Sequence, residues 1–294
     1  MADLYSVSLC AQAKSIRSSD EKKKQTFTQD QLFDDDTILL FTLTGKLNEL
    51  FNDRDNNVVY HPMMLHYKRK DSSLVSMPVK IQTRGNFRRS KQNCAMPPLM
   101  LNFTRSKKIK NNIFGNQNKL KLVVPCKGDD YVIREWLVYK LDNLITEKSF
   151  RARLAQVTFE DSLMKRKTET HYCILLEDEK SVADRNKTFI WNRTKVAMNN
   201  TDREQFLKMA VFQFMIGNTD WSVPYLQNIK LITKDSAIVP YTIPYDFDHA
   251  GIVDALMPYL LKSWNYLQHS SDSIVAIVKM IKQTLRKCLH CLIS

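Results

Sequence analysis

The chain has 294 residues, of which 44% are hydrophobic and 26% are charged, as is typical of a globular protein. This length is enough for one large domain or for two moderate lobes, each with a real core. The formal net charge is +13, and the absence of any run of about 18 apolar residues excludes a membrane-spanning helix.

The first residues carry a processing signal. Ala11-Gln-Ala13 is a small-x-small pattern of the kind that precedes signal-peptidase cleavage, although the charged region and the full apolar region of a signal peptide are missing. We interpret residues 1–13 as the remnant of a signal peptide, and we expect a periplasmic or extracellular protein. Disulfides form in such compartments, which makes Cys94, Cys126 and Cys173 candidates for one.

The next part of the chain predicts a flexible leader followed by strands. Residues 14–35 are polar and charged, and from Thr37 onward the sequence becomes rich in β-forming residues separated by Asp, Asn and Ser turns. The β-rich runs cover residues 38–44, 63–67, 74–83, 99–103 and 119–124. They predict a twisted antiparallel sheet that forms a β-rich N-lobe over residues 36–127.

Positive charge is concentrated in the second half of this predicted lobe. From Lys80 to Gly128 there are twelve Lys and Arg residues and no Asp or Glu. The segment is either a solvated basic face or a surface that binds phosphate, on a nucleotide, a polyanion or an anionic envelope. We expect no nucleic-acid partner, because no aromatic-interleaved nucleic-acid-binding module is recognisable.

Helical signals begin after Gly128. Apolar residues recur with helical spacing in the segment after this glycine, and Asp129 and Asp130 suit the start of a helix. Thr201-Asp-Arg-Glu204 predicts a capping box at the start of a later helix. We therefore expect a helical C-lobe over residues 128–255. A β-rich portion followed by a helix-rich portion predicts an α+β, two-lobed protein-kinase-like fold.

A group of acidic and amide residues comes after that later helix. Asp220 lies in the loop after the helix, Asn228 comes just before a strand, and a second strand ends at Asp246-Phe-Asp248. Phosphoryl transfer needs one carboxylate to orient the attacking hydroxyl, and an Asn and an Asp to hold Mg²⁺ against the phosphates. The alternative is that these residues only form turns, which Asp and Asn favour.

Several of these segments resemble the spore-coat CotH family of secreted atypical kinases. The likeness is carried by Arg84-Gly-Asn86, the predicted strand and helix over residues 120–141, Leu175-Leu-Glu177, Asn218-Thr-Asp220, Asn228 and Asp246-Phe-Asp248. Uncharacterised extracellular CotH-like proteins of Bacteroidetes-type bacteria are more similar still, since they share Arg84-Gly-Asn-Phe-Arg-Arg89 and Asn218-Thr-Asp-Trp221. The resemblance extends over about residues 75–250.

The resemblance implies a role for each residue of the acidic group. Asp220 would orient the acceptor hydroxyl, Asn228 and Asp246 would bind Mg²⁺, and Asp248 would be a second metal contact. One departure concerns the spacing, because seven residues separate Asp220 from Asn228 where a kinase loop has four.

The resemblance also implies a set of basic residues that contact the triphosphate of ATP. These are Arg84, Arg88, Lys91 and Lys121. Kinase sites pair such a cation with a helical Glu, for which Glu135 is the candidate; the alternative is a solvent-facing Glu135 beside Arg134. A second departure is that no Gly-rich phosphate-covering loop is present, which cations and backbone amides would have to replace.

The sequence thus predicts a Mg²⁺- and ATP-dependent atypical kinase that acts on an extracellular protein or glycan. The alternative is a non-catalytic surface or envelope protein on a degenerate kinase-like scaffold, which binds an anionic ligand through its basic segment.

The C-terminal residues 256–294 differ in character from the rest of the chain. Read one base out of frame, the codons allowed for Met257 to Asn265 can encode Tyr-Ala-x-Pro-Ala-Glu-Glu-Leu-Glu. This string resembles the segment after the Asp-Phe-Asp motif in the Bacteroidetes-type relatives. One hypothesis is that a frameshift replaced the native C-terminus.

Overall fold

The computed structural model of the chain describes residues 32–103, 112–115, 117–236 and 238–254. The predicted signal-peptide remnant (residues 1–13) and the atypical tail (residues 256–294) lie outside these ranges, as does most of the predicted leader. Within the described ranges, no helix has the length and apolar character needed to cross a lipid bilayer.

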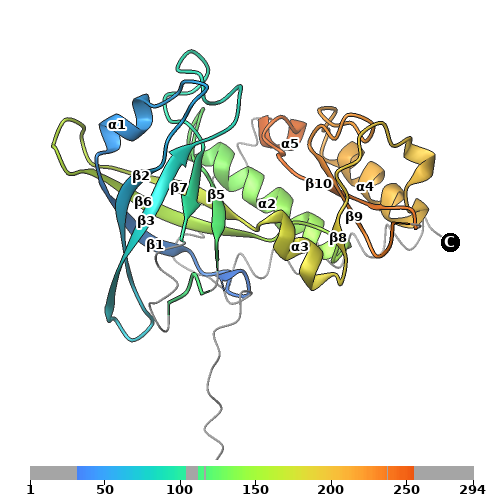
Figure 1. Ribbon diagram of the computed structural model, residues 1–294, viewed down its shortest axis with the longest axis horizontal. Helices are drawn as coiled ribbons and strands as arrows, with labels where there is room; N and C mark the ends of the chain where they lie inside the picture. The colour runs from blue at the N-terminus through green and yellow to red at the C-terminus, as the bar shows by residue number, and fades with distance from the viewer. Residues whose placement is uncertain (1–31, 104–111, 116, 237, 255–294) are drawn as a thin grey trace, which may run out of the picture.

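Seven strands close into a barrel in the order β1-β2-β3-β4-β5-β7-β6 (Figure 1). They are β1 (Leu39–Gly45), β2 (His61–Lys68), β3 (Leu74–Thr83), β4 (Leu99–Asn102), β5 (Lys119–Val123), β6 (Ala152–Asp161) and β7 (Glu169–Leu176). Neighbouring strands are antiparallel except β1 and β6, which pair in parallel. Buried and exposed residues alternate along β3, so that one side of the strand faces the core.

Apolar side chains fill the interior of the barrel. The ring of Phe114 stacks on Phe103 with centroids 4.8 Å apart, and its edge meets Phe41 and Tyr67. Leu32, from the end of the segment predicted to be a flexible leader, is buried in the same core. The barrel is therefore closed around a packed hydrophobic core.

A long helix connects the barrel to the remaining elements (Figure 1). α2 (Asp129–Ile145) packs on β6 and β7, and its Trp136 and Tyr139 share a core with Phe212 of α4 (Arg203–Met215). A three-stranded sheet lies beyond it in the order β10-β9-β8. Its strands are β8 (Phe189–Ile190), β9 (Ile229–Thr233) and β10 (Tyr241–Pro244). Short helices complete the fold: α1 (Leu47–Asn52), α3 (Glu179–Arg185), η3 (Met198–Asn200) and α5 (Gly251–Asp254).

The expected two-lobed protein-kinase-like fold is wrong. β6 and β7 belong to residues 128–255, which the sequence predicts to be a helical C-lobe, yet β6 pairs with β1 and β7 pairs with β5 to close the barrel. The boundary predicted at residue 127 therefore cuts through one closed mixed barrel. The physical reason is that β1 and β5 would otherwise be open sheet edges, and two long apolar strands supplied later in the chain cover them.

A disulfide anchors the loop between β3 and β4. Cys94 in this loop bonds to Cys126, which lies between β5 and α2, whereas Cys173 is a free thiol buried in the barrel. Arg54 supports the same loop by donating to the carbonyl oxygen of Cys94 at 2.8 Å. The loop that carries Arg84 and its basic neighbours is therefore held against the barrel.

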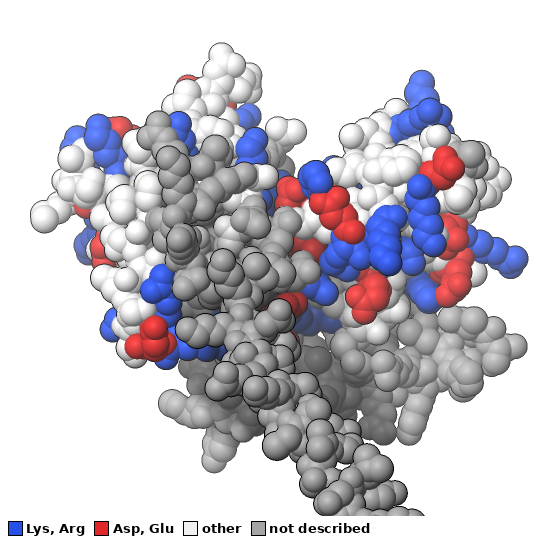
Figure 2. Space-filling model, turned by 60° about the horizontal axis from the view of Figure 1, so that its bottom comes forward, with Lys and Arg blue, Asp and Glu red and all other residues white. Residues whose placement is uncertain are grey.

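Charges of both signs are interspersed on the face that Figure 2 shows. Lys and Arg side chains on the right of this view alternate with Asp and Glu side chains. This face is not a uniformly basic surface, so the cations that matter for ligand binding have to be identified one by one from their partners.

Candidate functional site

The elements that carry most of the predicted site residues meet where the barrel adjoins α2 and the β8–β10 sheet (Figure 1). They come from the β3–β4 loop, from β5, from α2, from the loop after α4 and from the two ends of the β9–β10 hairpin. The residues that contacts and charges join into one cluster are Arg84, Arg88, Lys121, Glu135, Asp220, Asn228, Asp246 and Asp248.

The β9–β10 hairpin places Asn228 and Asp246 next to each other. Ile229 pairs with Pro244 at the end of the ladder, and the next residues continue it, since the amide of Tyr245 donates to the carbonyl of Asn228 at 3.0 Å. Asn228 (φ 50°) and Asp246 (φ 63°) both have left-handed backbone. Asn and Asp adopt this conformation more readily than other side chains, and such outliers cluster at functional sites.

Asp246 is fixed by the core beneath it. Its backbone amide donates to the hydroxyl of Tyr139, a buried residue of α2, at 2.9 Å. The next residue, Phe247, is fully buried between the rings of Tyr139 and Phe212, with centroid distances of 4.9 Å and 5.8 Å. In the Asp-Phe-Asp segment, the two Asp residues therefore precede and follow a Phe whose side chain is fixed in the core.

The loop after α4 presents Asp220. Its backbone amide donates to the side-chain oxygen of Asn218 at 3.0 Å, and Asn218 itself is buried. The Asp220 carboxylate accepts from two amides, with Gln227 Nε2 on Oδ1 and Asn228 Nδ2 on Oδ2, the second at 2.9 Å. Asn228 Nδ2 also reaches the carbonyl oxygen of Asp220 at 2.8 Å.

The additional residues between Asp220 and Asn228 form a small closed loop. Ser222 and Gln227 exchange two backbone hydrogen bonds, at 2.9 Å and 3.0 Å, which close residues 222–227 into a tight turn. The turn returns the chain to Asp220, so that Asn228 contacts the residue that it was predicted to accompany. The extra residues do not move Asn228 away from the site.

Several cations also lie near Asp246. Lys121 of β5 lies over the ring of Tyr245, with its Nζ 4.8 Å from the centroid. Burial, together with the positive charges of Arg84 and Lys230, lowers the pKa of Lys121 to about 8. Lys230 pairs with Glu179 of α3 at 3.1 Å, whereas neither Lys121 nor Arg84 has an ion-pair partner among the described residues.

Two further acidic residues, Glu135 and Asp248, lie near Asp246. Glu135 of α2 is fully buried, and burial and the charge of Asp246 raise its pKa well above the usual value for Glu. Asp248 lies 3.6 Å from the Nη1 of Arg88, and burial and the charge of Asp246 raise its pKa as well. Because Glu135 is buried, it is not a solvent-facing residue, and the positive charges of Arg88 and Arg84 act on it in the opposite direction by lowering its pKa.

Lys91 is not brought into this cluster. Its side chain is exposed, and it makes no contact with the other site residues among those that the structure describes. Glu177, part of the resemblance, is buried in an ion pair with Arg185 at 3.0 Å and accepts from the amide of Arg151, which gives it a structural role at the end of β7.

Sequence reasoning missed the residues that support the site. Lys230 comes two positions after Asn228, and the alternation of a strand could have placed both on one face. Tyr139 and Glu179 carry no local signal, because their roles depend on contacts across the fold. Glu179 Oε1 and Glu135 Oε1 are both buried without a hydrogen-bond partner among the described residues. The same is true of Arg88 Nε.

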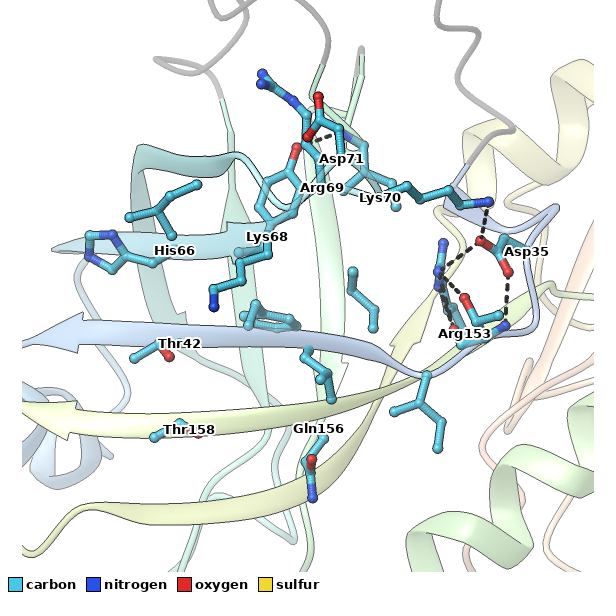
Figure 3. Close-up of a pocket in the computed structure, with 18 of the residues that line it drawn as sticks. Asp35, Thr42, His66, Lys68, Arg69, Lys70, Asp71, Arg153, Gln156 and Thr158 are labelled. Atoms are coloured by element: carbon cyan, nitrogen blue, oxygen red, sulfur yellow. Dashed lines mark hydrogen bonds and ion pairs between the residues drawn. The ribbon is translucent and has the colours of Figure 1, made fainter. Parts of the chain in front are cut away.

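A separate hollow of about 1070 Å³ lies on the outside of the barrel over β1 (Figure 3). Thr42, Gln156 and Thr158 line it along the strands, and the ion pair of Arg153 with Asp35 stands at one end. Its lining contains none of the residues that form the cluster around Asp246. It therefore contributes nothing to the arrangement around Asp246.

The donor set around Asp246 consists of oxygen ligands. Over the described residues, no group of three or more His, Cys, Asp or Glu side chains is placed to hold a metal by itself. Asn228 directs its side-chain amide nitrogen at Asp220, so its Oδ1 takes no part in that contact. One amide oxygen and one or two carboxylates suit a Mg²⁺ that keeps waters and is completed by substrate phosphates, rather than a metal held in an all-protein cage.

No family model matches this chain, and no curated protein matches it in sequence.

Proposed function

We propose that this protein is a Mg²⁺-dependent phosphotransferase that moves the γ-phosphoryl group of ATP to a hydroxyl of an extracellular protein or glycan. One observation carries the proposal. Asn228 and Asp246 leave the same end of one hairpin in left-handed conformations, and Asn228 also holds Asp220. An orienting carboxylate, a metal-binding amide and a metal-binding carboxylate thus share a single rigid support, as phosphoryl transfer requires.

Magnesium would be held by Asn228 and Asp246. The Asp246 carboxylate has no ion-pair partner among the described residues, and Asn228 offers its side-chain oxygen. Asp248 is the further contact, although it is paired with Arg88 at 3.6 Å. A bound Mg²⁺ supplies charge neutralisation for the phosphate oxygens.

The triphosphate would meet Lys121 and Arg84. Burial and the positive charge of Arg84 lower the pKa of Lys121, and neither cation has an ion-pair partner among the described residues. The charges of Asp246 and Glu179 act on Lys121 without forming an ion pair with it, and a polyphosphate would further offset the repulsion between the cations.

The transfer step needs little covalent chemistry from the protein. The acceptor oxygen bonds to the γ-phosphorus while the bond from that phosphorus to the β,γ-bridging oxygen breaks, and ADP leaves with the electron pair. Asp220 accepts the hydrogen bond of the acceptor hydroxyl and then its proton. Lys121 and Arg84 bind the phosphate oxygens, and the hairpin keeps the reacting groups oriented.

Two further observations bear on the acceptor and the compartment. The Cys94–Cys126 disulfide suits an oxidising compartment outside the cytoplasm. The motifs Arg84-Gly-Asn86 and Asn218-Thr-Asp220 resemble those of the secreted CotH-like kinases. Both support an extracellular or periplasmic acceptor.

A non-catalytic anion-binding protein is the second candidate, and one observation favours it. Arg88 already neutralises Asp248, so the cluster could bind an anion through Lys121 and Arg84 without binding a metal. The two functions differ in their need for magnesium.

Thermal-shift titration of the full chain with ATP, with and without Mg²⁺, separates the candidates. A ligand that binds only the folded state stabilises it by RT ln(1 + [L]/Kd). We expect stabilisation by ATP that depends on Mg²⁺, that is lost in Lys121→Ala and that is kept in Lys91→Ala, the exposed cation from the same segment. Equal stabilisation by ATP and by inorganic polyphosphate without Mg²⁺ supports the second candidate, and the absence of any shift overturns both.

A further inference from the structure

The side chain of Gln227 contacts Asp220 although the pattern of metal and phosphate residues does not require it. Gln227 Nε2 donates to Asp220 Oδ1, while Asn228 Nδ2 donates to Asp220 Oδ2 at 2.9 Å. Each carboxylate oxygen therefore accepts one amide hydrogen from a different residue. The carboxylate plane is fixed by two contacts, and a rotation about its Cβ–Cγ bond would break both.

The donors to Asp220 are neutral. No Lys, Arg or His forms an ion pair with Asp220 among the described residues, and every side-chain group that it contacts is an amide. An amide fixes the orientation of the carboxylate without neutralising it, whereas a Lys at the same position would neutralise the negative charge. Each oxygen still has a lone pair with which to accept a substrate hydroxyl.

The backbone that carries Gln227 is firmly held. Gln227 and Ser222 exchange two backbone hydrogen bonds, and the tip of the turn is tied down because the amide of Lys195 donates to the carbonyl of Pro224 at 2.7 Å. Val223 in the same turn is fully buried against Ile229 of β9. The backbone of Gln227 is therefore fixed by hydrogen bonds and packing, although its side chain is exposed.

We propose that Gln227 is a positioning residue that, together with Asn228, fixes the Asp220 carboxylate in the orientation that receives the acceptor hydroxyl. This inference rests on the proposed phosphotransferase function and adds a second donor to it. The proposal also accounts for the longer segment between Asp220 and Asn228. The closed turn over residues 222–227 ends at Gln227, whose side-chain amide donates to the Asp220 carboxylate.

The test compares two substitutions within one turn. Gln227→Leu removes the side-chain donor, and Ser222→Ala keeps the backbone pair and removes a hydroxyl that forms no hydrogen bond with the described residues. The measured quantities are the phosphoryl transfer rate from Mg-ATP to water or to the protein itself, and the Mg-ATP affinity from thermal shift.

We expect Gln227→Leu to lower kcat by about 10- to 100-fold without changing the Mg-ATP affinity, because misorientation of a reacting group has effects of this size. Ser222→Ala should match the wild type. In an Asp220→Ala background, Gln227→Leu should have no further effect, whereas a purely structural role would lower the rate in both backgrounds.

Three results overturn the proposal. One is equal kcat in Gln227→Leu and Ser222→Ala, and another is an equal loss of Mg-ATP affinity and turnover in Gln227→Leu. Both leave the phosphotransferase function standing, since the wild type remains active. The third is a wild type that binds Mg-ATP but transfers no phosphoryl group, which removes the proposed function and this inference with it.

Discussion

Asn228 contacts Asp220 twice, with its side-chain amide 2.9 Å from the carboxylate and 2.8 Å from the carbonyl oxygen of that residue. Both acceptors are oxygens, so the amide nitrogen of Asn228 must face Asp220 and its oxygen must point elsewhere. Asn228 thus connects the Asp220 carboxylate with the end of the hairpin that also carries Asp246. Loss of Asn228 should consequently impair both orientation and metal binding, whereas Asp220 and Asp246 can be separated.

The first prediction separates those two residues. Asp246→Asn keeps a side chain that tolerates φ 63° but removes the charge, and it should abolish Mg²⁺-dependent ATP binding, because a Mg²⁺ with few protein carboxylates cannot lose one. Asp220→Asn should leave Mg-ATP affinity nearly unchanged and lower turnover by about 10²-fold or more. Isothermal titration and a transfer assay measure the two effects. Equal ATP affinity in wild type and Asp246→Asn would show that Asp246 only forms a turn.

The proximity of most of the candidate residues could be predicted from the sequence, because the order of the motifs along the chain follows the hairpin. Asp220, Asn228 and Asp246 stand in the order that a hairpin brings together, and the hairpin has local signals in Lys234 and Asp235 at its turn. Lys91 fits the pattern only because it lies in a basic segment, and charge density along a chain does not say which side chains face inward.

The barrel could not be predicted in the same way. Its closure depends on the parallel pairing of β1 with β6, in which Leu39 pairs with Ala155 across more than a hundred residues. Hydrophobic alternation identifies a strand but does not name its neighbour. The contact of Gln227 with Asp220 was missed for a related reason, since an exposed Gln has no sequence signal and the contact depends on a turn that is visible only in three dimensions.

The second prediction concerns Lys121 and pH. Burial and neighbouring cations lower its pKa from 10.5 to about 8, so the folded state binds fewer protons than the unfolded state between these two values. Stability therefore rises with pH over that window, and the cost of the buried charge is complete below about pH 8. Lys121→Met should be more stable than the wild type at pH 7, and the difference should shrink as pH approaches 10.5.

Denaturant titrations of both proteins at pH 7 and pH 10 provide the measurement. ATP affinity should show the opposite trend, because the ammonium that attracts phosphate is lost above about pH 8. A stability difference that does not vary with pH would mean that Lys121 is not desolvated.

The third prediction concerns the disulfide. Cys94 and Cys126 are separated by 32 residues in the sequence, and a cross-link that closes a loop of this size stabilises a protein by about 3–4 kcal/mol in the chain-entropy model. The Cys94→Ser, Cys126→Ser double variant should lose up to about that much stability. It should also bind ATP more weakly, because the loop that carries Arg84 and Arg88 is released.

The free cysteine provides the control for that experiment. A reducing agent should lower the melting temperature of the wild type and of Cys173→Ala by the same amount, and it should leave the double variant unchanged. Insensitivity of the wild type to complete reduction, verified by thiol titration, would contradict the prediction.

The last prediction uses two buried glutamates with different partners. Glu135 is fully buried with an unpaired Oε1, and burial and Asp246 raise its pKa well above 4.5, so the folded state binds more protons than the unfolded state above that pH. Stability is then lost as pH rises from 4.5 towards the folded-state pKa. Glu135→Gln, which carries no charge, should match the wild type near pH 4 and exceed it at pH 7 by about 1–3 kcal/mol, the cost of an unsatisfied buried group.

Glu177→Gln is the matched control: burial raises the pKa of Glu177 as well, but its carboxylate pairs with Arg185 at 3.0 Å, which favours the charged form. Its replacement leaves the guanidinium with only the exposed carboxylate of Glu147, 4.0 Å away, and should destabilise the protein by about 1–3 kcal/mol at pH 7. Urea unfolding at both pH values measures all three proteins. A Glu135→Gln variant that is less stable than the wild type at pH 7 would mean that Glu135 is ionised and firmly paired with Arg84 or Arg88. Its contribution to stability would then resemble that of Glu177, and it would help to hold Arg84 and Arg88 in place.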